Sequence, residues 1–165
     1  MHIVITDSGL GGLSVCAQLI HLLKNYSVSE NLETVFDFRY KNSPNVFSNT
    51  LGVELLKQDG SAYVAGAPRN QRGQRANEVL KNIDFTRAFY ISSTEITRSQ
   101  FSQFDASKES DSLPITNVSW LEAIRFCNWL SQKEGLEPFY IFENNNYKGF
   151  SSRALGYRLP SEAEW

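Results

Sequence analysis

The chain has 165 residues, 41% hydrophobic and 13% aromatic, which is enough for one domain with a real core or a small domain with an appended piece. The net charge of −2 gives no electrostatic reason to expect nucleic acid or an anionic membrane as a partner. Two cysteines, Cys16 and Cys127, and two histidines, His2 and His21, exclude a disulfide framework and a Cys/His zinc site by number and spacing.

The N-terminus does not resemble a targeting segment. Asp7 interrupts its apolar stretch, basic residues are missing from the start, and no small-residue cleavage site follows a continuous hydrophobic block. Nothing approaches the ~18 to 20 uninterrupted apolar residues of a membrane span. The sequence therefore predicts a soluble, cytoplasmic chain.

Residues 1 to 24 predict a strand, a glycine loop and a helix. The strand is His2 to Thr6, the loop is Asp7 to Gly12, and the helical run is Leu13 to Lys24. This order is typical of the opening βα unit of a parallel α/β domain, whose loop N–H groups face the helix start. Cys16 falls inside the predicted helix, where packing is favoured over a nucleophilic role.

The loop Asp7-Ser-Gly-Leu-Gly-Gly12, followed by Leu-Ser, resembles the N-terminal motif of glutamate and aspartate racemases. The resemblance implies that Asp7 and Ser8 lie beside the α-carbon of an amino acid, where two cysteine thiolates exchange the α-proton. Because no cysteine lies between Cys16 and Cys127 to complete such a pair, an orphaned loop is the alternative interpretation.

The pattern of predicted elements changes near residue 50, and this change predicts a domain boundary there. Before it lies one predicted strand, Glu33 to Tyr40, and an Asn-Ser-Pro-Asn turn. After it, Leu51 to Leu56 and Ser61 to Gly66 predict a hairpin with its turn at Asp59-Gly60.

The next segment is polar and carries Arg69, Arg72 and Arg75. Charge clusters of this kind are usually solvated, so a surface loop is predicted, with anion binding as the alternative. Residues 79 to 85 alternate between apolar and polar, and Ala88 to Ser92 predicts a buried strand.

Two capping boxes predict helices in the second half of the chain. Thr97 with Gln100 begins a short one, and Ser119 with Glu122 begins an amphipathic helix that Gly135 ends. The predicted inner face of the second helix is aromatic and apolar, and comprises Trp120, Ala123, Ile124, Phe126, Cys127, Trp129 and Leu130. On that face, Cys127 is predicted to be a buried structural thiol rather than a redox cysteine.

Beyond this helix, Pro138 to Phe142 and Tyr147 to Ser151 predict a hairpin. Ser161 and Glu164 form a third capping box one residue before the last, Trp165. Since four residues cannot nucleate a helix, this ending predicts a domain that continues and a chain that is a fragment. All three tryptophans are expected to pack in the core rather than to stack on a peptide or sugar.

From Gly52 onward, the motifs resemble, in the right order, the formylglycine-generating enzyme (sulfatase-modifying factor) family. The motifs that carry the resemblance are Ala65-Gly66, Asn77-Glu78, Phe89-Tyr-Ile91, Glu95-Ile-Thr97, Pro114, Val118-Ser-Trp120, Ala123, Phe126-Cys-Asn-Trp-Leu130 and Tyr157-Arg-Leu-Pro-Ser-Glu-Ala-Glu-Trp165. The resemblance implies an α+β, C-type-lectin-like fold, here incomplete and preceded by the βα unit. It divides the chain into a racemase-like segment with linker, 1–50, and a family domain, 51–165.

The resemblance also implies chemistry that these residues do not supply. Complete members oxidise a target cysteine to formylglycine with copper and also bind calcium, or use non-haem iron, and they are often exported. Their redox cysteines and most calcium ligands follow the Arg-Leu-Pro motif, and their iron is held by histidines, so no catalytic or metal residue is transferred to this chain.

The predicted function is therefore a family domain that lacks its catalytic residues, with a cysteine-containing peptide or protein as the expected partner. Two alternatives stay open. One is an amino-acid racemase relative that uses Asp7 and Ser8, and the other is a non-catalytic, lectin-like module that binds a peptide or partner protein.

Overall fold

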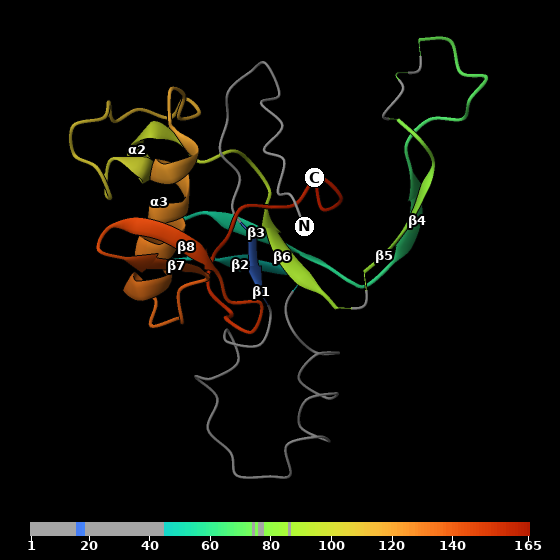
Figure 1. The fold of residues 1–165 in the computed structure, drawn as a ribbon. Coiled ribbons are helices and arrows are strands. Elements are labelled where there is room, and N and C mark those ends of the chain that lie inside the picture. The colour runs from blue at the N-terminus through green and yellow to red at the C-terminus, as the bar shows by residue number, and fades with distance from the viewer. Residues whose placement is uncertain (1–15, 19–44, 74, 76–77, 86) are drawn as a thin grey trace.

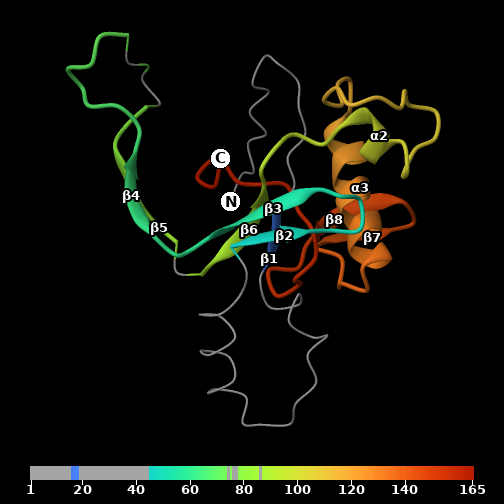
Figure 2. The same cartoon turned by 180° about the vertical axis from the view of Figure 1, so that it is seen from behind.

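The computed structural model describes residues 16–18, 45–73, 75, 78–85 and 87–165, which form a mixed α/β arrangement of small antiparallel sheets (Figures 1 and 2). The largest sheet has four strands in the order β1 (Cys16–Gln18), β6 (Phe89–Ser92), β3 (Glu54–Gln58) and β2 (Val46–Ser48). Strand β6 is the predicted buried strand, and the burial of Phe89 and Tyr90 confirms it. The finer prediction of a C-type-lectin-like core stays a prediction.

Strand β1 contradicts the helix predicted across Leu13 to Lys24. Its three residues run antiparallel to β6, with Cys16 opposite Ile91 and Gln18 opposite Phe89. The backbone groups along the edge of β6 require partners, and pairing with them overrides the local helical pattern. The predicted parallel βα unit is therefore wrong at these residues, while the rest of that unit and the predicted strand Glu33 to Tyr40 lie outside the described residues.

Helix α3 (Trp120–Lys133) is the packing centre of the described chain. The predicted capping box is confirmed: the Glu122 N–H donates to Ser119 Oγ at 3.2 Å, and the Ser119 N–H donates to the Glu122 carboxylate at 2.8 Å. The fully buried side chains of its inner face are Ile124, Phe126, Cys127 and Leu130. They join the sheet residues Leu55 and Tyr90 in one hydrophobic core.

The short helix α2 (Arg98–Phe101) packs beside α3 and begins with the predicted capping box of Thr97 and Gln100. Phe101 stacks on Phe126 with ring centroids 4.9 Å apart, and Phe104 meets the same ring edge-on. Aromatic contacts of this kind stabilise the pair beyond simple burial, and they fix a helix too short to be stable alone.

The predicted hairpin after α3 is confirmed as β7 (Tyr140–Glu143) and β8 (Asn146–Phe150). Its two turn residues, Asn144 and Asn145, have φ angles of 49° and 63°. A two-residue turn with both φ values positive has the twist that antiparallel strands need, and asparagine tolerates that conformation well.

The other predicted hairpin, Leu51 to Leu56 with Ser61 to Gly66, is wrong. Strand β3 pairs with β6, whereas β4 (Ala62–Ala65) pairs with β5 (Lys81–Asp84). A Cβ added at Gly60 would lie 2.4 Å from the Phe85 carbonyl oxygen, so this glycine allows two strands to approach rather than the chain to turn back.

The described residues between 61 and 85 form an arm that projects from the rest of the molecule in both views (Figures 1 and 2). The arm continues the direction of the β3–β6 pair. Gln58 lies opposite Phe89 in that pair and Ala62 lies opposite Asp84 in the arm, so the register shifts by one residue between them. The predicted arginine loop joins β4 to β5 at the far end, which we call the tip. The tip therefore stands apart from the hydrophobic core.

Candidate functional site

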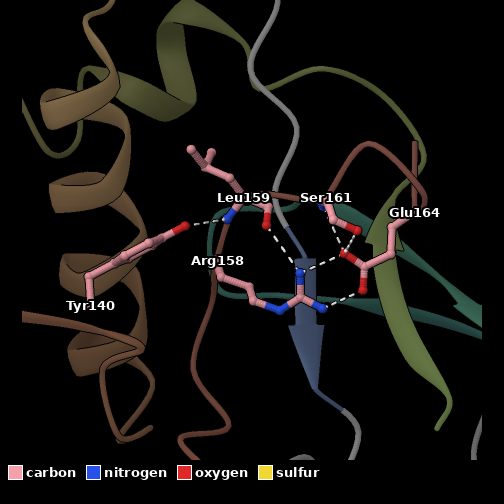
Figure 3. Close-up of polar contacts among 5 residues, drawn as sticks. All are labelled: Tyr140, Arg158, Leu159, Ser161 and Glu164. Atoms are coloured by element: carbon pink, nitrogen blue, oxygen red, sulfur yellow. Dashed lines mark hydrogen bonds and ion pairs between the residues drawn. The ribbon is translucent and has the colours of Figure 1, made fainter. Parts of the chain in front are cut away.

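The closing motif of the chain folds around an ion pair between Arg158 and Glu164 (Figure 3). Arg158 Nη1 donates to Glu164 Oε2 at 2.7 Å, and Nη2 donates to Oε1, so the contact is bidentate. The two side chains are only 13% and 9% exposed. Arg158 also lies over the Phe139 ring at 5.8 Å, which covers the guanidinium from one side.

Backbone groups of the same motif complete the cluster. Ser161 donates to Glu164 Oε2 from its N–H and from its hydroxyl, both at 2.8 Å, and the Leu159 N–H donates to the Tyr140 hydroxyl at 3.1 Å (Figure 3). One half of the third predicted capping box is thus present, namely the bond from the Ser161 N–H to the Glu164 carboxylate. A single turn follows it, in which the Trp165 N–H donates to the Ser161 carbonyl at 3.1 Å.

The environment of Glu164 favours its charged form. Burial alone raises the pKa of this carboxyl, but the hydrogen bonds and charge of Arg158, with the Ser161 donors, lower it further, so the net pKa lies below its ordinary value. Glu164 is therefore a carboxylate at neutral pH. Its lone pairs are taken by internal donors, which makes the cluster a structural clamp.

A second polar cluster closes the C-terminus of α3. Glu134 accepts from the Thr50 N–H at 2.8 Å, from the Thr50 hydroxyl at 2.9 Å, and from the Tyr157 hydroxyl at 2.6 Å. The Tyr157 N–H donates to Ser131 Oγ at 2.8 Å. Burial, with the adjacent Glu134 charge, raises the pKa of Tyr157 well above its ordinary value, so its phenol stays protonated.

Sequence reasoning missed the Glu134 cluster, although one signal was available. A carboxylate at a helix C-terminus faces the negative end of the helix dipole, so it needs donors from elsewhere. Glu134 stands directly after α3, and its donors come from positions 50 and 157, far away in sequence. Only the tertiary fold identifies them.

The predicted burial of Cys127 is confirmed, since its side chain lies fully buried in the core. Trp120 and Trp129 also pack as expected, with ring centroids 4.8 Å from Tyr147 and 5.7 Å from Phe104. Trp165 differs, because it is 61% exposed. The prediction that all three tryptophans lie in the core is therefore wrong for the last one.

Asp7 and Ser8, the residues of the racemase interpretation, lie outside the described part of the chain. Within the described part, no three His, Cys, Asp or Glu side chains form a group that could hold a metal ion. The same residues include no helix both long and apolar enough to cross a membrane. Arg69, Arg72 and Arg75 are exposed at the tip of the arm, as the surface-loop interpretation predicts.

The model of the sulfatase-modifying factor enzyme 1-like domain matches residues 48–165. The chain belongs to this family. The match contains every element from β3 to β8, together with the Arg158–Glu164 clamp and the Glu134 cluster. In this sulfatase-modifying-factor chain, the segment Arg158 to Glu164, which forms the clamp, lies within the matched residues.

A curated relative, the chaperone protein LppX of Paenibacillus barcinonensis, is 35% identical in an alignment 136 residues long, which covers 72% of this chain and 45% of the relative. Among solved structures, PvdO from Pseudomonas aeruginosa matches with a TM-score of 0.47 and 16% identity, over 58% of this chain and 46% of PvdO. The chain spans less than half the length of each. These matches give the racemase resemblance of residues 1 to 24 no support, so it stays a hypothesis.

Proposed function

We propose that this chain supplies scaffold of a sulfatase-modifying-factor domain and does not itself carry out the oxidation of a target cysteine to formylglycine. The position of Cys127 carries the proposal. A cysteine that reacts as a thiolate needs access to solvent and a positive neighbourhood. Cys127 instead lies fully buried on the inner face of α3, among Ile124, Phe126 and Leu130.

The two polar clusters support the same proposal. The charged ends of Arg158, Glu164 and Glu134 are bound by donors and acceptors of this chain, which link α3 to Thr50 and to the closing motif. Residues used in this way hold segments together. Chemistry on a cysteine-containing polypeptide would then depend on groups other than these.

The test is an oxidation assay on a synthetic cysteine-containing peptide, with the full chain, copper(II) and molecular oxygen, followed by mass spectrometry of the peptide. We expect no aldehyde product, and the same result for Cys127→Ser. A complete family enzyme is the positive control. Aldehyde formation by the chain would overturn the proposal, and its loss in Cys127→Ser would assign the chemistry to that thiol.

The relative named as a chaperone favours a second candidate function, which is binding of a polypeptide without chemistry. The exposed Trp165 and the apolar residues of the arm offer surface for such binding. The measurement is light scattering of a reduced, unfolding client protein with and without the chain. Suppressed aggregation at equimolar chain supports this function, and unchanged aggregation contradicts it.

A further inference from the structure

The outer edge of β6 is covered by β1, a strand of three residues (Figures 1 and 2). The Ser93 N–H donates to the Glu54 carbonyl at 2.8 Å, which fixes the alternation of the β3–β6 ladder. Every second residue from Ser93 therefore turns its backbone groups toward β3, and Tyr90, which is out of phase with them, turns its own toward β1. Tyr90 lies opposite Ala17, so this residue pair carries the hydrogen bonds between the two strands.

Strand β6 has none of the features that prevent an edge from pairing. Proteins protect an exposed strand edge with charged residues or proline, because an unprotected edge pairs with other strands. The sequence of β6 is Phe-Tyr-Ile-Ser, which contains neither a charge nor a proline. Its Phe89 and Tyr90 side chains are buried and fix the strand in the molecule. Within the described residues, β1 is the only strand on this side of β6.

Strand β1 comes from outside the family domain. The family model matches residues 48–165, which include β3 and β6 but not β1. Strand β3 pairs with β6 at four positions, whereas β1 pairs with it at three. Because each backbone hydrogen bond adds little net stability, a strand held by one bonded residue pair is easily displaced.

We propose that the outer edge of β6 is a binding site for an extended polypeptide strand, and that β1 occupies this site within the same chain. The site rests on the second candidate function, polypeptide binding, and names the place where the polypeptide binds. An incoming strand replaces β1, runs antiparallel to β6 and exchanges both backbone hydrogen bonds with Tyr90. Strand addition takes its affinity from backbone bonds, so the partner is an extended segment rather than a folded surface.

A disulfide between the two strands tests whether β1 controls the site. Cys16 lies opposite Ile91 in a pair that is not hydrogen bonded, and the Cα atoms of such pairs lie about 4.5 Å apart, a separation that a disulfide allows. Oxidation of full-length Ile91→Cys should therefore lock β1 onto β6. The double variant Cys16→Ser, Ile91→Cys cannot form this bond and is the matched control. Failure of Ile91→Cys to form the disulfide would overturn the proposal.

The binding measurement is the fluorescence anisotropy of a labelled peptide of residues 13–21 with Cys16→Ser. We expect oxidised Ile91→Cys to bind this peptide at least about 10-fold more weakly than the double variant, because the locked site is not competent. Equal binding by both, or binding by neither, would overturn the proposal.

Proline substitutions in the peptide test whether binding uses backbone pairing, and they do not depend on how any variant of the chain folds. The peptide with Ala17→Pro lacks the N–H that faces Tyr90, so it should not bind. The peptide with Gln18→Pro loses an N–H that points away from β6, so it should bind as the parent does. Equal binding by the two proline peptides would contradict strand addition.

The client-protein assay separates this site from polypeptide binding in general. Oxidised Ile91→Cys should suppress aggregation of the client less than the double variant does in the same buffer. Equal suppression by both would leave polypeptide binding in place and overturn β6 as its site. Peptide binding that the disulfide blocks, without suppression by either variant, would support the site and contradict the chaperone-like function.

Discussion

At the scale of single residues, Arg158 and Glu164 show how a charged motif can serve packing. Removing two charges from water is costly, and that cost is offset only when both are paired and fully hydrogen bonded. The bidentate contact, the Ser161 donors and the Phe139 ring meet that condition. The pair therefore fixes the closing motif in one geometry.

Glu164→Gln keeps the size of the side chain but removes its charge, which leaves the Arg158 guanidinium without its counter-ion. We expect a loss of about 3 kcal/mol in the free energy of unfolding, at the lower end for a broken buried pair. Urea unfolding followed by circular dichroism measures it. The control is Glu162→Gln, an exposed neighbour, which should change stability by less than about 0.5 kcal/mol. Equal losses would show that the ion pair is not structural.

At the scale of elements, the capped helices are the parts that sequence predicts best. A capping box is a local signal, because Ser119 and Glu122 satisfy each other's backbone groups within one turn. The asparagine turn between β7 and β8 is equally local. Such elements follow from a few adjacent residues, whatever the rest of the chain does.

The arm shows why the other elements are harder to predict. Asp59-Gly60 has the composition of a turn, but Gly60 is required for a close approach to Phe85, 25 positions further along the chain. Likewise, the helical pattern around Cys16 yields to pairing with β6. Both partners are distant in sequence. The contacts of Arg158 and Glu164 were equally hard to predict. The sequence from Arg158 to Trp165 indicates the family, but it does not show which of these side chains bind each other.

Ser119→Ala removes the acceptor for the Glu122 N–H and one donor to its carboxylate. We expect unfolding stability to fall by about 1 kcal/mol, which is typical for loss of an N-cap. The matched control is Ser112→Ala, in an exposed loop before the helix, with an expected change below about 0.5 kcal/mol. Thermal melting at neutral pH separates the two variants, and a control as destabilised as the cap variant would contradict this assignment.

At the scale of the whole molecule, the shifted pKa values bound the pH range of stability. The pKa values of Glu122 and Glu164 in the folded chain lie below their ordinary value. The stability that these carboxylates add is therefore complete above their pKa in the unfolded chain, and it is lost as the pH falls through their pKa in the folded chain. For Glu122 the main cause is the Ser119 hydroxyl, and for Glu164 the hydrogen bonds and charge of Arg158 outweigh burial.

Tyr140 and Tyr157 have the opposite shift, since burial raises their pKa values. Their contribution is complete below the unfolded tyrosine pKa, near 10, and is lost as pH rises toward the folded value. We expect stability to decline below about pH 4.5 and above about pH 10. Urea midpoints across pH measure this profile, and Glu164→Gln should flatten its acid side. An unchanged acid slope in that variant would contradict the role of Glu164.

The hydrogen bond from the Tyr63 hydroxyl to the Ala163 carbonyl, 2.6 Å long, joins positions 100 residues apart and ties the arm to the closing turn. During synthesis the arm emerges long before its anchor does. Contacts between residues so far apart in sequence form late, because closing a long loop costs conformational entropy. Contacts in the hydrophobic core must form first to offset that cost. We therefore expect the arm to reach its final orientation as one of the last steps of folding.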